Sequence, residues 1–439
     1  MDDRPVSRVL DLSDPASNRI VNMSVEEARG RVARGTADGV RAIDGSFALC
    51  GTDGATVRLA RSIDRPLRYF LAKQADGPLL VLSDRIDRIR EALDARGLAG
   101  QFHPSYTRMV PAHHVVTIRL VGCPDPDPEY ARFFSPARGV LPADTAAIGR
   151  RYVSALASEI GKWLEALPPA EPIGVCFSGG IDSGAVFLLT YHLVRRMGQS
   201  PARLKAFTLS AGEGADLVQA RAFLDTLDLG FFLEPIEADP ASLDPREAVR
   251  VVEDYKPLDV ESATMALALC RGIRERYPDW KHLADGDGGD ENLKDYPIEE
   301  NGELTIKSVL NNPMLYQEGW GVGTIKHSLT YTGGQSRSYT RTYAPLARHG
   351  FEGFSPFTRP SVVEIAEGIP FVTLTNFRHE RLYALKGEIV SKGVEAVTGM
   401  RMPVFPKRRF QDGAPGPEAR TAWRKTESFY RAEFLSQYV

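Results

Sequence analysis

Short apolar runs separated by turn-forming residues mark about the first 140 residues of the chain. One stretch among them, 84–96, has the spacing of apolar residues that a helix requires. Glycine and aspartate lie between the runs, as at 51–54. Five runs have the length and composition of strands: 46–50, 56–60, 69–72, 79–82 and 114–118. The pattern predicts an antiparallel, β-rich first domain of the α+β type, with few helices.

The pattern changes after a stretch rich in proline. Residues 123–143 hold two clusters of proline and glycine, so we expect a linker there, between a domain at 1–135 and a domain at 144–439. Helical stretches then alternate with short apolar runs: helix 144–167, strand 173–177, helix 184–196, strand 204–209 and helices 216–227, 246–255 and 261–277. This alternation predicts an α/β domain with a doubly wound parallel sheet, whose ligands bind at the carboxyl ends of its strands.

The rest of the chain is less regular. Residues 301–348 are rich in glycine, asparagine, serine and tyrosine without clear periodicity, which predicts a loop-rich insertion. Helical spacing returns at 361–368 and 376–399, and the tail 418–439 has it again. Between them, 401–413 is a basic loop interrupted by prolines.

Composition narrows the function. The 439 residues are 43% hydrophobic and 25% charged, and a net charge of −3 gives no general attraction to nucleic acid. Small-molecule or peptide substrates are favoured. The four cysteines, Cys50, Cys123, Cys176 and Cys270, are far apart and form no CxxC pair. No signal peptide and no apolar run of about 18 residues is visible, so we expect a cytoplasmic protein without a membrane segment.

The strand predicted at 173–177 ends in Ser178-Gly-Gly-Ile-Asp-Ser183, and a helix follows at once. Two glycines at a helix N-terminus bring main-chain N–H groups close to an anion, and the helix dipole favours the same negative charge. Asp182 fits beside a phosphate only if a cation such as Mg²⁺ bridges the two. The strand, the Ser-Gly-Gly-x-Asp-Ser run and the helix together resemble the signature of the PP-loop ATP pyrophosphatases, which cleave ATP between its α and β phosphates. The GxxxxGK[ST] pattern of a P-loop is absent, so transfer of the γ phosphate is disfavoured.

A second stretch, Gly286-Asp-Gly-Gly-Asp-Glu291, gathers carboxylates that repel each other unless cations neutralise them. A calcium loop of the EF-hand type is disfavoured, because Tyr296 stands where that loop needs a glutamate.

Together with these two stretches, Lys407 and Phe410-Gln-Asp-Gly413 resemble, in order and spacing, the asparagine synthetases and their relatives, the β-lactam synthetases and lasso-peptide cyclases. The first domain resembles a class II glutamine amidotransferase domain, of the Ntn type, at 43–49 and 59–69. Asp2 stands where those domains have their nucleophilic cysteine, so we expect a degenerate domain that does not hydrolyse glutamine.

The resemblance implies roles for individual residues. Lys407 would stabilise developing charge, and Asp287 would act as a base or contact the substrate. Glu261 replaces a family arginine that helps to bind pyrophosphate, so that either Arg408 or Arg409 compensates or Glu261 binds a substrate amine. Mg²⁺ would be held by Asp182 and Asp290. The nucleotide would be held by Phe177, Ser178, Gly179, Gly180, Asp182, Ser183, Leu209 and Gly286.

The resemblance therefore implies a ligase that uses ATP and Mg²⁺ to adenylate a carboxylate and then joins it to an amine. The amine could belong to the same molecule or to a second substrate, or it could be ammonia. Two alternatives stay open at this point: a PP-loop tRNA-modifying enzyme, and a nucleotide-binding scaffold without turnover. Whether the chain forms a homodimer is also open.

Overall fold

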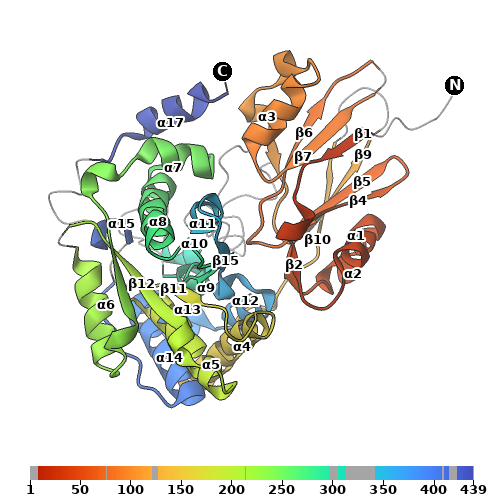
Figure 1. Ribbon diagram of the computed structural model, residues 1–439. Helices are drawn as coiled ribbons and strands as arrows, with labels where there is room; N and C mark the ends of the chain where they lie inside the picture. Colours follow the sequence, from red (N-terminus) through yellow and green to blue (C-terminus); the bar gives the residue numbers. More distant parts are fainter. Residues whose placement is uncertain are drawn as a thin grey trace. The chain divides into compact units, whose positions relative to one another are not determined.

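The computed structural model describes residues 8–75, 77–120, 127–212, 214–295, 305–311, 342–407, 410–414 and 423–438. Contacts divide the chain into two compact units (Figure 1). Unit 1 contains the described residues up to Ser135 and the end of the chain from Arg431, and unit 2 contains those from Pro136 to Tyr430. Asp2, the arginines at 408 and 409 and most of the predicted insertion lie outside the described residues.

Unit 1 is built on two four-stranded sheets, with strand orders β1-β7-β6-β8 and β10-β9-β5-β4. All neighbours are antiparallel except the parallel pair of β1 and β7. Two further strands, β2 and β3, form a small antiparallel pair. The elements are β1 (Arg8–Asp11), β2 (Arg19–Ile20), α1 (Val25–Arg34), α2 (Ala37–Arg41), β3 (Gly45–Ser46), β4 (Ala48–Asp53), β5 (Thr56–Arg61), β6 (Arg68–Ala72), β7 (Leu79–Ser83), α3 (Ile86–Asp94), β8 (Arg108–Met109), β9 (His114–Arg119) and β10 (Glu129–Arg132).

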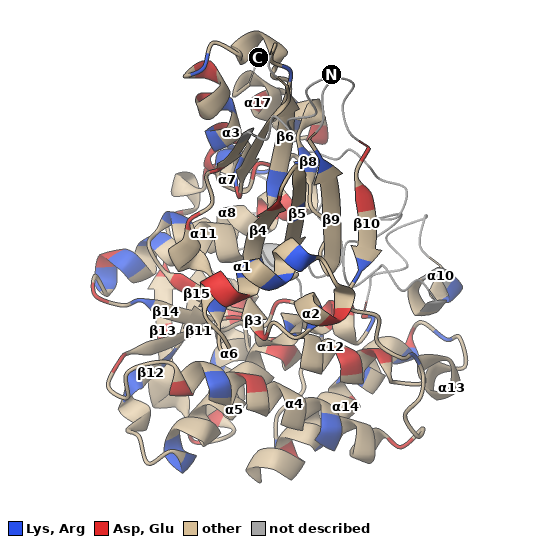
Figure 2. Cartoon of the chain, turned by 90° about the vertical axis from the view of Figure 1, so that its right-hand side faces the viewer, with Lys and Arg blue, Asp and Glu red and all other residues tan. Residues whose placement is uncertain are grey.

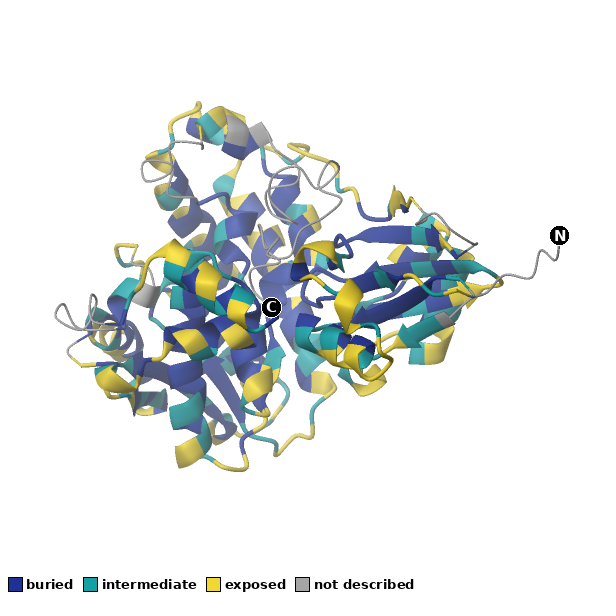
Figure 3. Ribbon diagram, turned by 90° about the horizontal axis from the view of Figure 1, so that it is seen from above, coloured by how far each residue is buried: buried dark blue, intermediate teal, exposed yellow. Residues whose placement is uncertain are grey.

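The core of unit 1 follows from alternation along its strands. In β7, Leu80 and Leu82 join residues of β5 and β9 in one buried cluster, so the two sheets pack face to face. Leu79 and Val81 point to the opposite face and pack with Ile89 of α3. Figure 3 shows that the strands are mostly buried, whereas the outer sides of the helices are exposed.

Unit 2 is organised around a five-stranded parallel sheet with the order β13-β12-β11-β14-β15. Its strands are β11 (Ile173–Cys176), β12 (Leu204–Ser210), β13 (Leu233–Glu237), β14 (His282–Ala284) and β15 (Glu352–Phe354). Its helices are α4 (Thr145–Glu165), α5 (Ile181–Arg196), α6 (Ala215–Asp225), α7 (Pro245–Val252), α8 (Pro257–Arg276), α9 (Gly289–Asn292), α10 (Ile306–Asn311), α11 (Ala344–Arg348), α12 (Pro360–Glu367), α13 (Phe371–Thr375), α14 (Arg381–Thr398) and α15 (Phe410–Gly413). A last helix, α17 (Glu427–Ser436), includes residues of both units.

Helices cover both faces of the parallel sheet. Leu204 and Ala206 of β12 pack in one buried cluster with α4, α5 and α14, whereas Phe207 and Leu209 pack in a second cluster with α8. Figure 1 shows α5 and α14 on one side of the sheet and α8 on the other. The predicted α/β class is therefore confirmed.

Predicted helices and strands are observed where the local sequence pattern is sufficient to specify them. The strand expected at 204–209 is β12, and the helix expected at 144–167 is α4, which Asp144 caps by accepting the N–H groups of Ala146 and Ala147. The helix expected at 376–399 is α14, which begins only at Arg381 because Asn376 and Phe377 have positive φ. Of the helix expected at 418–439, residues 423–438 are described, and within them α17 covers only Glu427–Ser436.

Two global properties complete the fold. None of the described helices is long and apolar enough to cross a membrane. Figure 2 shows both basic and acidic residues on α4 and on α14.

Candidate active site

The loop between β11 and α5 has the geometry of a phosphate site. Gly179 has φ 70°, and a Cβ added to it would lie 2.8 Å from the backbone of Ala220, so only glycine fits there. Gly180 precedes α5 and supplies no side-chain cap. The first N–H groups of a helix 16 residues long therefore have no capping side chain and can meet an anion.

Two hydroxyl groups brace this loop from within. The hydroxyl oxygens of Ser178 and Ser183 lie 3.2 Å apart, and the N–H of Ser178 donates to Ser183 Oγ at 3.2 Å. Phe177 lies differently, because its ring packs against Phe187 and Phe223 in the core. The loop thus presents hydroxyl and N–H groups, whereas the side chain of Phe177 belongs to the core beneath it.

The segment that follows β14, residues 285–295, is called the acidic loop below, and the run from Ser178 to Ser183 is called the phosphate loop. The two loops meet because β14 lies beside β11 in the sheet. The chain adds β12 and β13 on one side of β11 and then returns to place β14 on the other, which is the reversal where ligands bind in such sheets. A Cβ on Gly286 would lie 2.8 Å from the nitrogen of Ser183, and a Cβ on Gly289 would lie 2.2 Å from Asp182 Oδ1. Both glycines are therefore required for the two loops to touch.

A lysine that the sequence analysis did not single out lies between the two loops. Lys386 of α14 has a side chain that is only 2% exposed, and its Nζ donates to Asp182 Oδ2 at 2.6 Å and to Asp290 Oδ1. A third carboxylate, Asp295, lies 3.8 Å from the same ammonium. The structure thus unites the two predicted metal ligands and adds a buried cation between them.

Lys407 belongs to the same cluster. Its Nζ donates to Asp295 Oδ2 at 2.7 Å and to the main-chain oxygen of Asp295 at 2.8 Å, and it lies 3.4 Å from Asp290 Oδ1. The side chain of Lys407 is 31% exposed, against 2% for that of Lys386. Asp182, Asp290 and Asp295 with Lys386 and Lys407 are called the charge cluster below.

The electrostatics of the charge cluster follow from its burial. Burial raises the pKa of the Asp182 carboxyl, the neighbouring Asp290 raises it further, and Lys386 opposes both. Burial also raises the pKa of Asp295, against the effect of the two lysines. Burial alone would lower the pKa of Lys386, but its three carboxylate neighbours raise it well above the ordinary value. Lys386 therefore carries a positive charge at neutral pH.

The remaining predicted residues lie around these loops. Asp287 donates its N–H to Asp285 at 3.0 Å, and its carboxylate accepts the hydroxyl of Thr342 at 2.7 Å. Leu209 is buried at the carboxyl end of β12, the strand beside β11. Both positions are compatible with a ligand that extends from the phosphate loop along the strand ends.

Glu261 is paired within the chain. Its Oε2 lies 3.2 Å from Arg424 Nε, and Arg424 Nη2 donates to Asp412 Oδ1 at 2.7 Å. The two arginines suggested as compensating cations, 408 and 409, are outside the described residues. Glu261 is thus neutralised by an arginine from the C-terminal segment, which the sequence pattern did not indicate.

The charge cluster suits a magnesium ion that is completed by phosphate oxygens. Among the residues described, no group of three or more histidine, cysteine, aspartate or glutamate side chains is arranged to hold a metal. Mg²⁺ is, however, often bound by one or two carboxylates and by phosphate oxygens of the substrate. Asp182 Oδ1 is buried without a hydrogen-bond partner, as is expected of a carboxylate oxygen that binds a cation. Asp182 and Asp290 therefore fit the ion.

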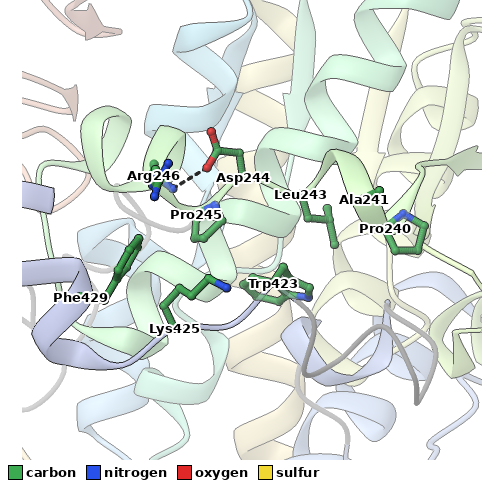
Figure 4. Close-up of a pocket in the computed structure, with 9 residues that line it drawn as sticks. All are labelled: Pro240, Ala241, Leu243, Asp244, Pro245, Arg246, Trp423, Lys425 and Phe429. Carbon is green, nitrogen blue, oxygen red and sulfur yellow. Dashed lines mark hydrogen bonds between the residues drawn. The ribbon is translucent and has the colours of Figure 1, made fainter.

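A cavity of about 260 Å³ lies elsewhere in unit 2, at the N-terminus of α7 (Figure 4). Within it, Asp244 accepts the main-chain N–H of Arg246 at 2.9 Å, and the guanidinium of Arg246 lies 5.4 Å from the ring centre of Phe429. The lining consists of Pro240, Ala241, Leu243, Asp244, Pro245, Arg246, Trp423, Lys425 and Phe429. None of these residues belongs to the phosphate loop or to the charge cluster.

One sequence signal could have identified Lys386. It lies in the predicted helix 376–399, four residues after Leu382 and three before Ile389, both of which are buried. Residues three and four apart share a helix face, so Lys386 is a lysine on the apolar face of an amphipathic helix. A charge in that place needs a buried partner. Asp295 had no comparable signal.

Comparison with protein families agrees with this geometry. The asparagine synthase family matches residues 167–329, which include the phosphate loop and the acidic loop. A search of curated proteins finds no significant match to the chain. The family consists of ATP-dependent ligases that form amide bonds. The chain therefore contains a domain, at residues 167–329, that is similar to the asparagine synthases.

Proposed function

We propose that this protein adenylates a substrate carboxylate with ATP, releases pyrophosphate and joins the acyl group to an amine. The observation that carries the proposal is the charge cluster, because it places Lys386 and Lys407 beside a helix N-terminus built for phosphate. Two ammonium groups and free N–H groups suit a triphosphate that loses a highly charged leaving group.

The side chains divide the work by position. The first main-chain N–H groups of α5 would bind the β and γ phosphates, which are the part of ATP that leaves. Lys386, held between Asp182 and Asp290, would stabilise the charge on that leaving pyrophosphate. Lys407, on the exposed side of the cluster, would stabilise charge on the reacting acyl phosphate and again during attack by the amine.

Magnesium would be held by Asp182 and Asp290 together with phosphate oxygens, and it would neutralise phosphate charge that the two lysines do not. With every group ionised, the three carboxylates and two lysines of the charge cluster sum to one negative charge. A divalent cation would therefore balance the negative charge of the cluster, and the negatively charged phosphates of ATP would bind to the cation.

Glutamine is not the source of the amine in this proposal. Within the described part of unit 1, Cys50 lies in β4, and burial raises the pKa of its thiol to about 12, with Asp11 adding to the effect. A thiol with that pKa is not a nucleophile at neutral pH. The purified protein is expected to release no glutamate from glutamine, which an enzymatic glutamate assay would measure; release at the rate of AMP formation would refute this part.

The test is a screen for AMP formed from ATP and Mg²⁺, with pools of carboxylic acids, amino acids and peptides, each with and without added amines. A carboxylate that supports the ATP–pyrophosphate exchange reaction by itself would identify the adenylated substrate, and an amine that then accelerates AMP release would identify the nucleophile. Release of ADP and orthophosphate in place of AMP and pyrophosphate would overturn the proposal.

A further inference from the structure

Lys407 is held by one residue of the acidic loop, and the contact has two parts. The ammonium donates to the carboxylate of Asp295 at 2.7 Å and to the main-chain oxygen of the same residue at 2.8 Å, whereas Asp290 is 3.4 Å away. We propose that Asp295 is a positioning residue that fixes the ammonium of Lys407 for the reaction. This inference rests on the proposed function, because it assigns Asp295 a role in that same site.

The carboxylate of Asp295 is fixed by the turn that carries it. The preceding residue, Lys294, is buried with φ 56°, a conformation that residues other than glycine rarely adopt. Its ammonium pairs with Glu367 at 2.8 Å, and Glu367 also accepts the guanidinium of Arg138 at 3.0 Å. The N–H of Asp295 donates to the main-chain oxygen of Asp290 at 2.9 Å. The turn is therefore anchored on both sides of the Lys294–Asp295 bond before any ligand arrives.

Asp295 prevents Lys386 and Lys407 from competing for the same carboxylate. Lys386 is paired with Asp182 and Asp290, the two carboxylates that fit Mg²⁺. Without Asp295, the nearest carboxylate to Lys407 would be Asp290, which lies only 0.7 Å farther from it than Asp295 does, at 3.4 Å against 2.7 Å. Two ammonium groups would then compete for one carboxylate. Asp295 thus keeps Lys407 at the edge of the cluster and leaves Asp290 to the metal and Lys386.

The experiment combines Asp295→Asn with Lys407→Ala, singly and together, and measures kcat and KM for ATP from AMP formation. Asparagine keeps an acceptor oxygen but removes the charge, so kcat should fall about tenfold with a change in KM below about threefold. In the Lys407→Ala background, Asp295→Asn should change kcat by less than about twofold, because the residue acts through Lys407. Asp295→Ala, which removes the acceptor, should lower kcat further than Asp295→Asn.

A matched control is available in the same unit. Lys205 and Glu234 form a pair at 2.8 Å with side chains 28% and 10% exposed, close to the 31% and 7% of Lys407 and Asp295. Lys205 and Glu234 lie near the beginnings of β12 and β13, away from the strand ends that carry the loops. Glu234→Gln should leave kcat within about twofold of the original value.

Two results would overturn the proposal. One is a kcat for Asp295→Asn equal to that of the unaltered protein, and the other is a double variant in which the two losses multiply. Thermal unfolding without substrate distinguishes failure of the role proposed for Asp295 from failure of the proposed function. If Asp295 holds Lys407, the double variant should lose about 3 °C less in Tm than the sum of the single losses. Additive Tm losses would refute the contact even if the protein made no AMP, whereas absence of AMP with coupled Tm losses would refute only the proposed function.

Discussion

Two buried cations, one in each unit, have different hydrogen-bond partners. In unit 1, the guanidinium of Arg61, only 2% exposed, donates to main-chain oxygens that include those of Val110, Ile63 and Arg65. In unit 2, the ammonium of Lys386 is equally buried, but its partners are carboxylates that come from α5 and from the acidic loop.

This difference separates a structural role from a functional one. Carbonyl groups of a folded turn are fixed dipoles, so Arg61 stabilises the conformation of the segment around it. Carboxylates brought together from separate elements repel each other, and they raise one another's pKa unless cations intervene. Strongly perturbed charges that meet at the ends of strands mark a place where a ligand binds. The predictions below test this distinction, from the largest expected effect to the smallest.

Lys386→Met should lower AMP formation by about a thousandfold or more. Methionine keeps much of the volume but leaves Asp182 and Asp290 facing each other and the phosphates without a buried cation. Far-UV circular dichroism would establish that the variant folds, and Lys386→Arg, which keeps the charge, should recover part of the activity. Lys205→Met is the control and should retain more than about half of the rate. If a folded Lys386→Met protein kept a rate within tenfold of the original, Lys386 would not have the functional role that the comparison assigns to it.

Lys407→Ala should lower kcat by about a hundredfold, with a smaller change in ATP affinity and no loss of folded protein. An ammonium directed at developing negative charge in a site that excludes water contributes on the order of 3 kcal/mol to the rate. Steady-state kinetics of AMP formation would measure the effect. If the variant kept more than about a third of the original kcat, Lys407 would be an ordinary surface lysine.

Unit 1 should lose stability in mild acid through two buried histidines. Burial lowers the pKa of His113 to about 3 and that of His114 to about 4, with Arg61 among the neighbouring cations that add to the effect. Below the ordinary pKa of 6.5, the unfolded chain binds protons that the folded unit does not, so stability is complete above that pH and falls as the pH decreases. At pH 5 each histidine should cost about 2 kcal/mol.

The measurement is equilibration in urea at pH 7.5 and pH 5, followed by a brief deuterium pulse at one common pH and mass spectrometry of peptides from β4 to β9. His113→Asn should remove about half of the pH effect, because asparagine tolerates the φ of 59° at this position and does not titrate. An unchanged pH dependence in this variant would mean that the histidines do not control acid stability.

Much of the site could be predicted because its loops are local. The run from Ser178 to Ser183 contains its own strand end, glycines and helix start, and the structure has the predicted arrangement. The strands β13, β14 and β15 were not predicted, since β13 contains Pro235 and two glutamates and each of the others has three residues. Such short segments form strands only because β11 and β12 are already in place.

The partners of the charged residues could not be predicted, because they depend on contacts between distant parts of the chain. Asp295 meets Lys407 across 112 positions and Arg424 meets Glu261 from the C-terminal segment. Nothing in the local pattern distinguishes these side chains from solvated charges on a surface. Lys386 was the exception, since its place on an apolar helix face is visible in the sequence.

The most direct test of the account measures ATP binding by calorimetry, because it does not require the unknown carboxylate and amine. The unaltered protein should bind ATP in a manner that depends on Mg²⁺. Asp182→Asn should weaken that binding by about tenfold or more, since it removes a carboxylate that pairs with Lys386 and that would bind the metal. Glu234→Gln should bind ATP like the unaltered protein. If the unaltered protein and Asp182→Asn bound ATP with equal affinity, or if ATP binding did not depend on Mg²⁺, the claim that the charge cluster binds the triphosphate would be contradicted.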